Sequence, residues 1–478
     1  MFLHLPARRT LLVLLSLAQL MVILDISAVN VALPTLSRDL GIARGDLEWT
    51  ITSYSLLFGS LLLLGGRAAD RLGRRRTFLT GLALFTTASL VAALAPSAGA
   101  LYAARAAQGI GAALLSPSAL SIITTTFASG RERAVALGVW GAVSGAGAAV
   151  GVLLGGILTD WISWRAIFFI NAPIGVVVAI GVLRSVSADP ERPRWLGLDI
   201  RGALLATASL AALLEALAGA HDAGWTSAQT LGLGVAALIG LTGFALLERR
   251  TARPLLRVER LADRAIAGGW AAMLLASAIL IGSFLLTSVY LQEVLGASPL
   301  ETGLGFLPIA VVAGAGAHIG SQLVRRVGVR TGMAAAFVLA GVGTLLLSRI
   351  GGTGSYPGDI LPGMLLTGLG LGIALVSATV SVLTSAGEDD AGMLSGLTNT
   401  GHEIGGALGL ATLTTIAAQT IGTAAAPGRV ALAAGLGHAF LAAAVLSGAG
   451  LLLALVLLPA ASQFLPRLRQ AGRPIAIH

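Results

Sequence analysis

Residues 66–76 read GRAADRLGRRR, a short charged and glycine-containing run between two long apolar stretches. Residues 321–330 read SQLVRRVGVR and also directly follow an apolar stretch. When residues 326–328 are aligned with residues 71–73, an arginine falls on Asp70, so the second copy keeps the spacing and loses the acid. The same loop in two places indicates that the chain consists of two related halves.

The composition is that of a polytopic membrane protein. Of 478 residues, 56% are hydrophobic and 11% are charged, and the mean hydropathy is +0.88. A soluble domain carries about 25% charged residues. The formal net charge of +9 is located in short loops between apolar runs, so it reports membrane topology and not a nucleic-acid partner.

Apolar runs of about 20 residues, the length that spans a bilayer, recur along the chain and predict fourteen transmembrane helices. Two arginines precede the first run, but no small-residue cleavage site follows it, so we interpret it as a retained helix and not as a signal peptide. The predicted helices cover residues 10–33, 48–67, 77–95, 99–124, 134–159, 164–183, 199–220, 228–247, 266–290, 301–323, 331–349, 360–384, 393–421 and 433–459.

The distribution of arginine predicts the orientation. An even number of spans places both termini on the same side of the membrane. If that side is the cytoplasm, 24 arginines fall in inner segments and five in outer segments, and this excess agrees with the positive-inside rule. We therefore expect a multi-pass protein of the bacterial cytoplasmic membrane with both termini cytoplasmic.

The repeated loop follows the second helix of each half if the seventh and eighth helices are treated as an insertion. This predicts an all-α protein with an N-terminal six-helix bundle (residues 1–190), an inserted helix pair (191–250) and a C-terminal six-helix bundle (251–478). Two bundles that rock around a site near the bilayer midplane are the architecture of many secondary transporters.

Several classes of function are excluded by the residue types present. The chain has no cysteine and all its basic residues are arginine, which excludes thiolate metal sites, cysteine nucleophiles and the lysine of a P-loop. No sequence grouping of His, Asp and Glu indicates a catalytic or metal centre, so we expect neither an enzyme nor a bound metal or cofactor. A channel or receptor would leave the charged loop and the intramembrane acids unexplained.

Asp25 and Arg105 are charged residues within predicted spans, and such residues are functional candidates. Asp25 lies about 22 Å along the first helix from its inner end, and Arg105 about 9 Å along the fourth from its outer end. Both fall in the outer half, where an ion pair would lower the cost of burying each charge. Gln108 shares the face of Arg105. The pair serves either proton coupling or only the attachment of two helices.

Glu403 lies about ten residues into the thirteenth predicted helix, near the midplane and without an evident basic partner. Because burial disfavours an ionised carboxylate, Glu403 is a candidate proton carrier; alternatively, it only donates a hydrogen bond between helices. Asn399 lies one turn earlier on the same face. We expect it to line a substrate cavity together with Asn30, Gln108 and His318.

The loop at residues 66–76 is predicted to act as a conformational latch. Asp70, at a helix boundary, can accept backbone N–H bonds from the start of a neighbouring helix and can pair with arginine. Gly66 and Gly73 permit tight turns. Such contacts form on one side of a rocking motion and break on the other.

The fifth predicted helix is rich in glycine and reads GVWGAVSGAGAAVGVLLGG at residues 138–156. Small residues that recur every four positions allow two helix backbones to approach closely. We therefore expect this helix to pack directly against another one.

Several segments together resemble the major facilitator superfamily, and within it the fourteen-helix drug:proton antiporters. The loop at 66–76 is similar to the superfamily's shared loop motif. The fifth helix departs from the antiporter pattern, because Ala148 and Val152 stand where prolines are expected. The sequence therefore does not predict whether this helix has the bend that proline would impose. The other similar segments are LDISAVNVALP (24–34), LYAARAAQGIGAALLSPS (101–118), WRAIFFINAPIG (164–175) and NTGHEIGGALG (399–409).

The resemblance implies proton-coupled export of drugs or other amphipathic small molecules by alternating access, carried out by a monomer in the lipid bilayer with the proton gradient as its energy source. It implies a coupling role for Asp25 and a supporting role for Arg105. Export of one endogenous antibiotic, lipid or metabolite would share every motif, and proton-coupled uptake is the less favoured alternative. The implied gating residues are Gly66, Arg67, Asp70, Arg71, Gly73 and Arg74.

Overall fold

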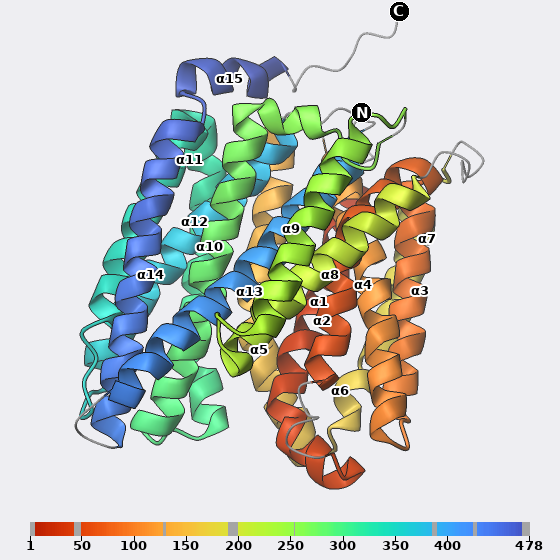
Figure 1. The fold of residues 1–478 in the computed structure, drawn as a ribbon. Coiled ribbons are helices and arrows are strands. Elements are labelled where there is room, and N and C mark those ends of the chain that lie inside the picture. The colour runs from red at the N-terminus through yellow and green to blue at the C-terminus, as the bar shows by residue number, and fades with distance from the viewer. Residues whose placement is uncertain are drawn as a thin grey trace, which may run out of the picture.

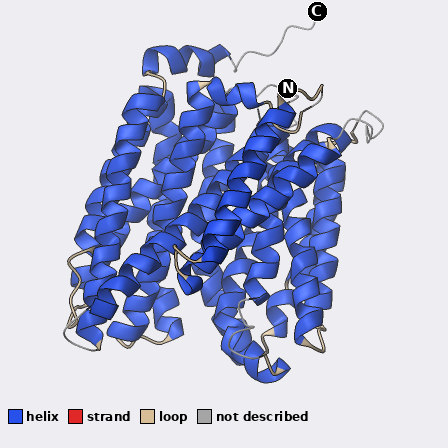
Figure 2. Cartoon of the chain, viewed as in Figure 1, coloured by secondary structure: helices blue, strands red, loops and turns tan. Residues whose placement is uncertain are grey.

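The computed structural model describes residues 5–42, 49–127, 131–189, 199–252, 254–384, 390–423 and 428–470. This part of the chain is almost entirely helical and contains no strand (Figure 2). Helix occupies each of the fourteen ranges that the apolar runs predict. Helices satisfy their backbone hydrogen bonds internally, which is the requirement for a segment surrounded by lipid.

The helical elements differ in length and regularity, and three short 3-10 or π turns, labelled η, join or extend them. In chain order they are α1 (Leu5–Leu40), α2 (Trp49–Leu72), α3 (Arg74–Ala93), α4 (Ala98–Thr126), α5 (Arg131–Trp161), α6 (Arg165–Phe169), α7 (Asn171–Ser185), α8 (Ile200–Ala223), α9 (Ala228–Glu248), η3 (Val258–Ala262), α10 (Arg264–Val289), η4 (Tyr290–Val294), α11 (Pro299–Leu347), η5 (Tyr356–Ile360), α12 (Leu361–Thr384), α13 (Ala391–Thr423), α14 (Arg429–Leu457) and α15 (Ala461–Gln470).

Ten helical segments in the described part of the chain are long and apolar enough to cross a bilayer. The protein is therefore a multi-pass membrane protein, as its composition predicts. One of the ten is the long α11, which covers two of the predicted spans. The count of fourteen spans stays a prediction.

The second copy of the loop differs from the expectation of two separate helices at 301–323 and 331–349. Helical hydrogen bonding continues through both as α11, which bends at Gly328, where φ is +82°. Gly73, between α2 and α3, has a φ of +101°. Both values favour glycine, because it lacks a Cβ. The two copies thus share a backbone turn at the glycines that the sequence alignment pairs, which supports the internal repeat.

Two further differences concern a break and an extra helix. The sixth predicted span is divided into α6 and α7 at Ile170. Beyond the last predicted span, α15 lies across the ends of the other helices (Figure 1) and buries Phe464. Its apolar and basic residues are mixed over only ten positions, which is too short for an apolar run that spans a bilayer.

The helices form two groups with α8 and α9 in front of them (Figure 1). In this view α10 to α14 lie on the left, and most of α1 to α7 lie on the right. Contacts between the two groups run along α5 with α11 and along α2 with α13, and α8 touches both α2 and α13. These two interfaces position the residues considered below.

The glycine-rich face of α5 packs directly against α1, which confirms the expectation from its spacing. Gly147, Gly151 and Gly155 recur every four residues and lie against the backbone or side chains of residues 20–28. A Cβ at Gly155 would lie only 2.7 Å from the Cα of Ala28. The helix continues from Arg131 to Trp161 without interruption.

Candidate functional site

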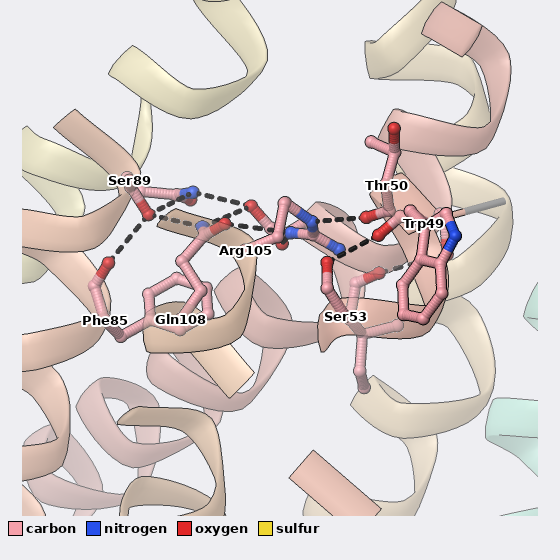
Figure 3. Close-up of polar contacts among 11 residues, drawn as sticks. Trp49, Thr50, Ser53, Phe85, Ser89, Arg105 and Gln108 are labelled. Carbon is pink, nitrogen blue, oxygen red and sulfur yellow. Dashed lines mark hydrogen bonds and ion pairs between the residues drawn. The ribbon is translucent and has the colours of Figure 1, made fainter. Parts of the chain in front are cut away.

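Asp25 of α1 is buried, with 1% of its surface exposed, and forms an ion pair with the equally buried Arg105 of α4. This is the pair that matching of helix depths predicts. Arg105 also donates from Nε to the backbone oxygen of Thr50 in α2, at 3.0 Å (Figure 3). The pairing offsets part of the cost of removing both charges from water.

Two amides and a hydroxyl complete the surroundings of this ion pair. Gln108 Nε2 donates to Asp25 Oδ1 at 2.9 Å and to Ser89 Oγ at 2.7 Å (Figure 3). Asn171 Nδ2 lies 3.2 Å from each of the same two oxygens, and Arg105 Nη1 donates to Gln108 Oε1 at 2.9 Å. Residues of α1, α2, α3, α4 and α7 therefore meet in one polar network, which fixes their positions relative to one another.

Tyr54 lies at the edge of this network. The guanidinium carbon of Arg105 is 4.4 Å from the centroid of the Tyr54 ring, a cation–π contact. Gly109 allows the backbone of α4 to approach the Tyr54 carbonyl. The Tyr54 hydroxyl is fully buried and has no hydrogen-bond partner among the described residues. A buried hydroxyl without a partner is costly, so it is a candidate to bind another group.

Glu403 of α13 lies opposite Gly59 of α2 and is partly buried. In contrast to Asp25, its carboxylate has neither an ion pair nor a hydrogen bond with any residue that the structure describes. The neighbouring His402 instead contacts Ser277 Oγ through Nδ1 at 2.6 Å. Glu403 is therefore an acid without compensation at the interface between α2 and α13.

Two buried side-chain N–H donors near Glu403 also have no hydrogen-bond partner among the described residues. Asn399 Nδ2 lies one helical turn before Glu403, and Trp270 Nε1 of α10 lies beside Gly401. Together with the Tyr54 hydroxyl, they offer donors from α2, α10 and α13. This composition suits the recognition of an amphipathic molecule that carries a few acceptors.

Asp70 makes the contacts expected of a latch. Its two carboxylate oxygens accept hydrogen bonds from the backbone N–H groups of Gly392 and Met393, at 2.8 and 2.9 Å. These residues begin α13, where unpaired N–H groups and the helix dipole favour a negative charge. Arg67 lies 3.8 Å from Asp70, and Gly66 contacts the backbone of Gly392. The end of α2 is thereby attached to the start of α13.

Asp390, one residue before α13, is a second buried acid at this end of the molecule and was not singled out from the sequence. Its Oδ2 accepts from Arg260 Nη2 at 2.6 Å and from Arg257 Nη1 at 3.4 Å, both in the linker between α9 and α10. The start of α13 is thus held by Asp70 on one side and, through Asp390, by the linker on the other.

Asp189, which follows α7, is a further acid missed in the sequence. Its carboxylate accepts from the backbone N–H of Arg76 at 2.9 Å and from that of Arg75 at 3.4 Å. It thereby caps the start of α3 and contacts Gly73 at the turn. The segment around Asp189 has no apolar pattern from which its position at the start of α3 could have been predicted.

The structure does not bring together the three predicted cavity residues whose side chains it describes. Gln108 is fully buried in the Asp25 network, and Asn399 lies beside Glu403. His318 is exposed on α11, ten residues before the bend at Gly328 that contacts α15. Asn30 belongs to α1, but its side chain lies outside the described residues.

Comparison with known proteins gives consistent relatives. The cephamycin export protein CmcT of Amycolatopsis lactamdurans is 39% identical over 98% of this chain and 95% of its own length. The puromycin resistance protein pur8 of Streptomyces alboniger is 39% identical over 86% and 82%, respectively. The tetracenomycin C resistance and export protein of Streptomyces glaucescens is 31% identical over 84% and 74%.

The fold also has a counterpart among solved structures. The human organic anion transporter MFSD10 (TETRAN) has a TM-score of 0.66 with 16% identity, and the match covers 93% of this chain and 99% of that one. At this identity the likeness concerns the fold alone. Residues 15–410 match the model of the Major Facilitator Superfamily. With this match over most of the chain and relatives aligned over most of their length, the chain belongs to the Major Facilitator Superfamily.

Proposed function

We propose that the protein is a proton-coupled efflux transporter that exports antibiotics or other amphipathic small molecules by alternating access. Three relatives named above carry out export of, or resistance to, cephamycin, puromycin and tetracenomycin C, which supports export of this kind of molecule. In this proposal both termini are cytoplasmic, and residues 1–190 and 251–478 form two bundles that move against each other as a monomer.

The contrast between Asp25 and Glu403 is the observation that carries the coupling mechanism. Protonation of Asp25 would remove the counter-charge of Arg105, which would remain buried and unpaired at a large cost. Protonation of Glu403 removes a charge that has no partner among the described residues. Glu403 is therefore the proton carrier, and the Asp25 network maintains the shape of the N-terminal helices.

The transport cycle follows from differential affinity for two states. A proton from outside neutralises Glu403 and favours the state that is open inside. Substrate then enters from the cytoplasm and binds to donors such as Tyr54, Asn399 and Trp270 at the interface between the bundles. Its binding favours release of the proton and the return movement. The bonds of Asp70 to the start of α13 close the inner side during export.

Export of a single antibiotic is the second candidate. Two relatives, the cephamycin export protein and the tetracenomycin C resistance and export protein, are each named for one antibiotic, which favours a dedicated substrate. Growth of a sensitive host that expresses the protein, on a panel of antibiotics and cationic dyes, separates the two candidates. Protection against one chemical class indicates a dedicated exporter, and protection against several indicates multidrug efflux.

Transport in inverted membrane vesicles tests proton coupling. We expect substrate uptake to require a proton gradient, and Glu403→Gln to abolish this dependence while substrate binding persists. Glu215 is a partly buried acid of α8. Glu215→Gln is therefore the matched control and should behave as the wild type. Transport that survives collapse of the gradient would end the antiporter proposal. Normal coupling in Glu403→Gln would assign the proton to another acid.

A further inference from the structure

A basic pocket lies where α5 and α11 separate, at the end of the molecule that carries α15. Its volume is about 430 Å³. One turn along α5 from Val135, Gly138 packs against Ser321 of α11, so the two helices are in contact beside the pocket. The pocket is lined by Val135 of α5 and by His318, Gln322, Arg325 and Arg326 of α11.

The polar side chains of the pocket are suited to an anion. Gln322 Nε2 lies 2.7 Å from His318 Nε2, and Arg325 Nε donates to the Ser321 carbonyl at 3.1 Å, so three of the lining side chains are held by contacts within their own helix. Among the described residues, no acidic side chain forms an ion pair with Arg326 or His318. Guanidinium groups bind phosphate oxygens through two parallel hydrogen bonds.

The depth of the pocket corresponds to the headgroup region of a membrane. Gly328 contacts Ala461 at the start of α15, and α15 lies across the helix ends as an interfacial amphipathic helix does (Figure 1). Arg326 is about 3 Å from this level along the axis of α11, and His318 is about 15 Å from it. The basic groups therefore extend from the interface towards the acyl region.

Exposed apolar side chains flank the pocket. Val135 and Val139 of α5 are 39% and 38% exposed, and Ile319 of α11 is 40% exposed. A small soluble anion would gain nothing from these groups, whereas an acyl chain would bury them. Basic pockets between helices on the cytoplasmic side bind anionic lipid headgroups in other membrane proteins.

We propose that this pocket binds the phosphate of an anionic phospholipid headgroup, whose acyl chains lie along Val135, Val139 and Ile319. The bound lipid touches α5 and α11, which belong to the two proposed bundles. The site is separate from Glu403, and the inference does not depend on which substrate the protein exports.

Lipid titration of the purified full-length protein in a neutral detergent tests the proposal. Phosphatidylglycerol should raise the melting temperature in a saturable way, and native mass spectrometry should show the retained lipid. Phosphatidylcholine and inorganic phosphate should have little effect. Arg325→Gln/Arg326→Gln should require about tenfold more phosphatidylglycerol, and the milder Arg326→Gln should show a smaller shift. Arg249→Gln/Arg250→Gln makes the same charge change on exposed residues after α9.

Three outcomes would overturn the proposal. The first is that phosphatidylcholine stabilises the protein as well as phosphatidylglycerol does, since the anionic charge would then be irrelevant. The second is that inorganic phosphate reproduces the effect, which would make the pocket a site for a soluble anion. The third is that both arginine pairs weaken lipid binding equally, because binding would then reflect the overall positive charge. If Arg325→Gln/Arg326→Gln fails to fold, the lipid affinity of Arg326→Gln is compared with that of Arg249→Gln/Arg250→Gln instead.

Discussion

Replacement of Asp70 by asparagine should shift the protein towards the state that is open on the inside. The carboxylate accepts two backbone hydrogen bonds from the start of α13, at 2.8 and 2.9 Å. Asparagine offers one carbonyl oxygen and no charge, so one of these bonds is lost and the other is weakened. Because Asp70 belongs to α2 and the donors to α13, the loss affects only the state in which these ends touch.

The size of the shift follows from the two bonds. A hydrogen bond to a charged group contributes about 1.5–3 kcal/mol, and a charge at a helix N-terminus about 0.3–1 kcal/mol. We expect a net loss of about 2–3 kcal/mol from the closed state. The ratio of inner-closed to inner-open molecules should fall by roughly 30- to 150-fold.

Distance measurement between spin labels provides the assay. The chain has no cysteine, so labels can be attached at Thr80→Cys in α3 and Ser462→Cys in α15, two exposed positions at the same end of the molecule. Asp70→Asn should increase the population with the longer distance. Asp189→Asn is the matched control, because Asp189 caps α3 without reaching α13. The reasoning is wrong if Asp189→Asn gives the same change, or if Asp70→Asn changes the populations by less than about threefold.

Three further predictions concern stability. Arg105→Gln should destabilise the protein by about 3–5 kcal/mol, and Asp25→Asn/Arg105→Gln should recover part of the loss; equal melting temperatures of both variants would contradict this coupling. Gly155→Ala should lower the free energy of unfolding by about 1–3 kcal/mol, because the added Cβ meets Ala28. Gly156 faces open space, so Gly156→Ala should be neutral or stabilising in the same thermal assay. Asp390→Asn should accelerate hydrogen exchange in residues 254–262; unchanged exchange would show that its arginine contacts do not hold the linker.

Features that depend on one helix and its depth could be predicted from the sequence. Apolar length identified the helices, and counting from each membrane face paired Asp25 with Arg105, because a helix has a fixed rise per residue. Asp70 could be assigned as a cap because an acid at a helix boundary can accept N–H bonds from the start of a neighbouring helix. These predictions need only local geometry.

Features that depend on which helices are neighbours could not be predicted. Asn171 and Ser89 join the Asp25 network from α7 and α3, yet each is a polar residue within a mainly apolar run, and Ser89 has two threonines close to it. Asp390 accepts a hydrogen bond from Arg260, which lies 130 residues away in the chain. Hydropathy does not say which face of a membrane helix meets another helix, since lipid and protein interior are both apolar. The arrangement of helices has to be known first.

The proposed proton site and the latch share a single interface, so coupling between them needs no long pathway. Gly59, on α2, faces Glu403; further along, the backbones of α2 and α13 meet at Gly396 and again at Gly66, beside the bonds of Asp70. The distance from Gly392 to Glu403 along α13 is about 16 Å. In the proposed mechanism, protonation would change how Glu403 fits against Gly59 and tilt α13 relative to α2, and the helix would transfer that tilt to its start. The two bonds of Asp70 are directional, so such a tilt would weaken them.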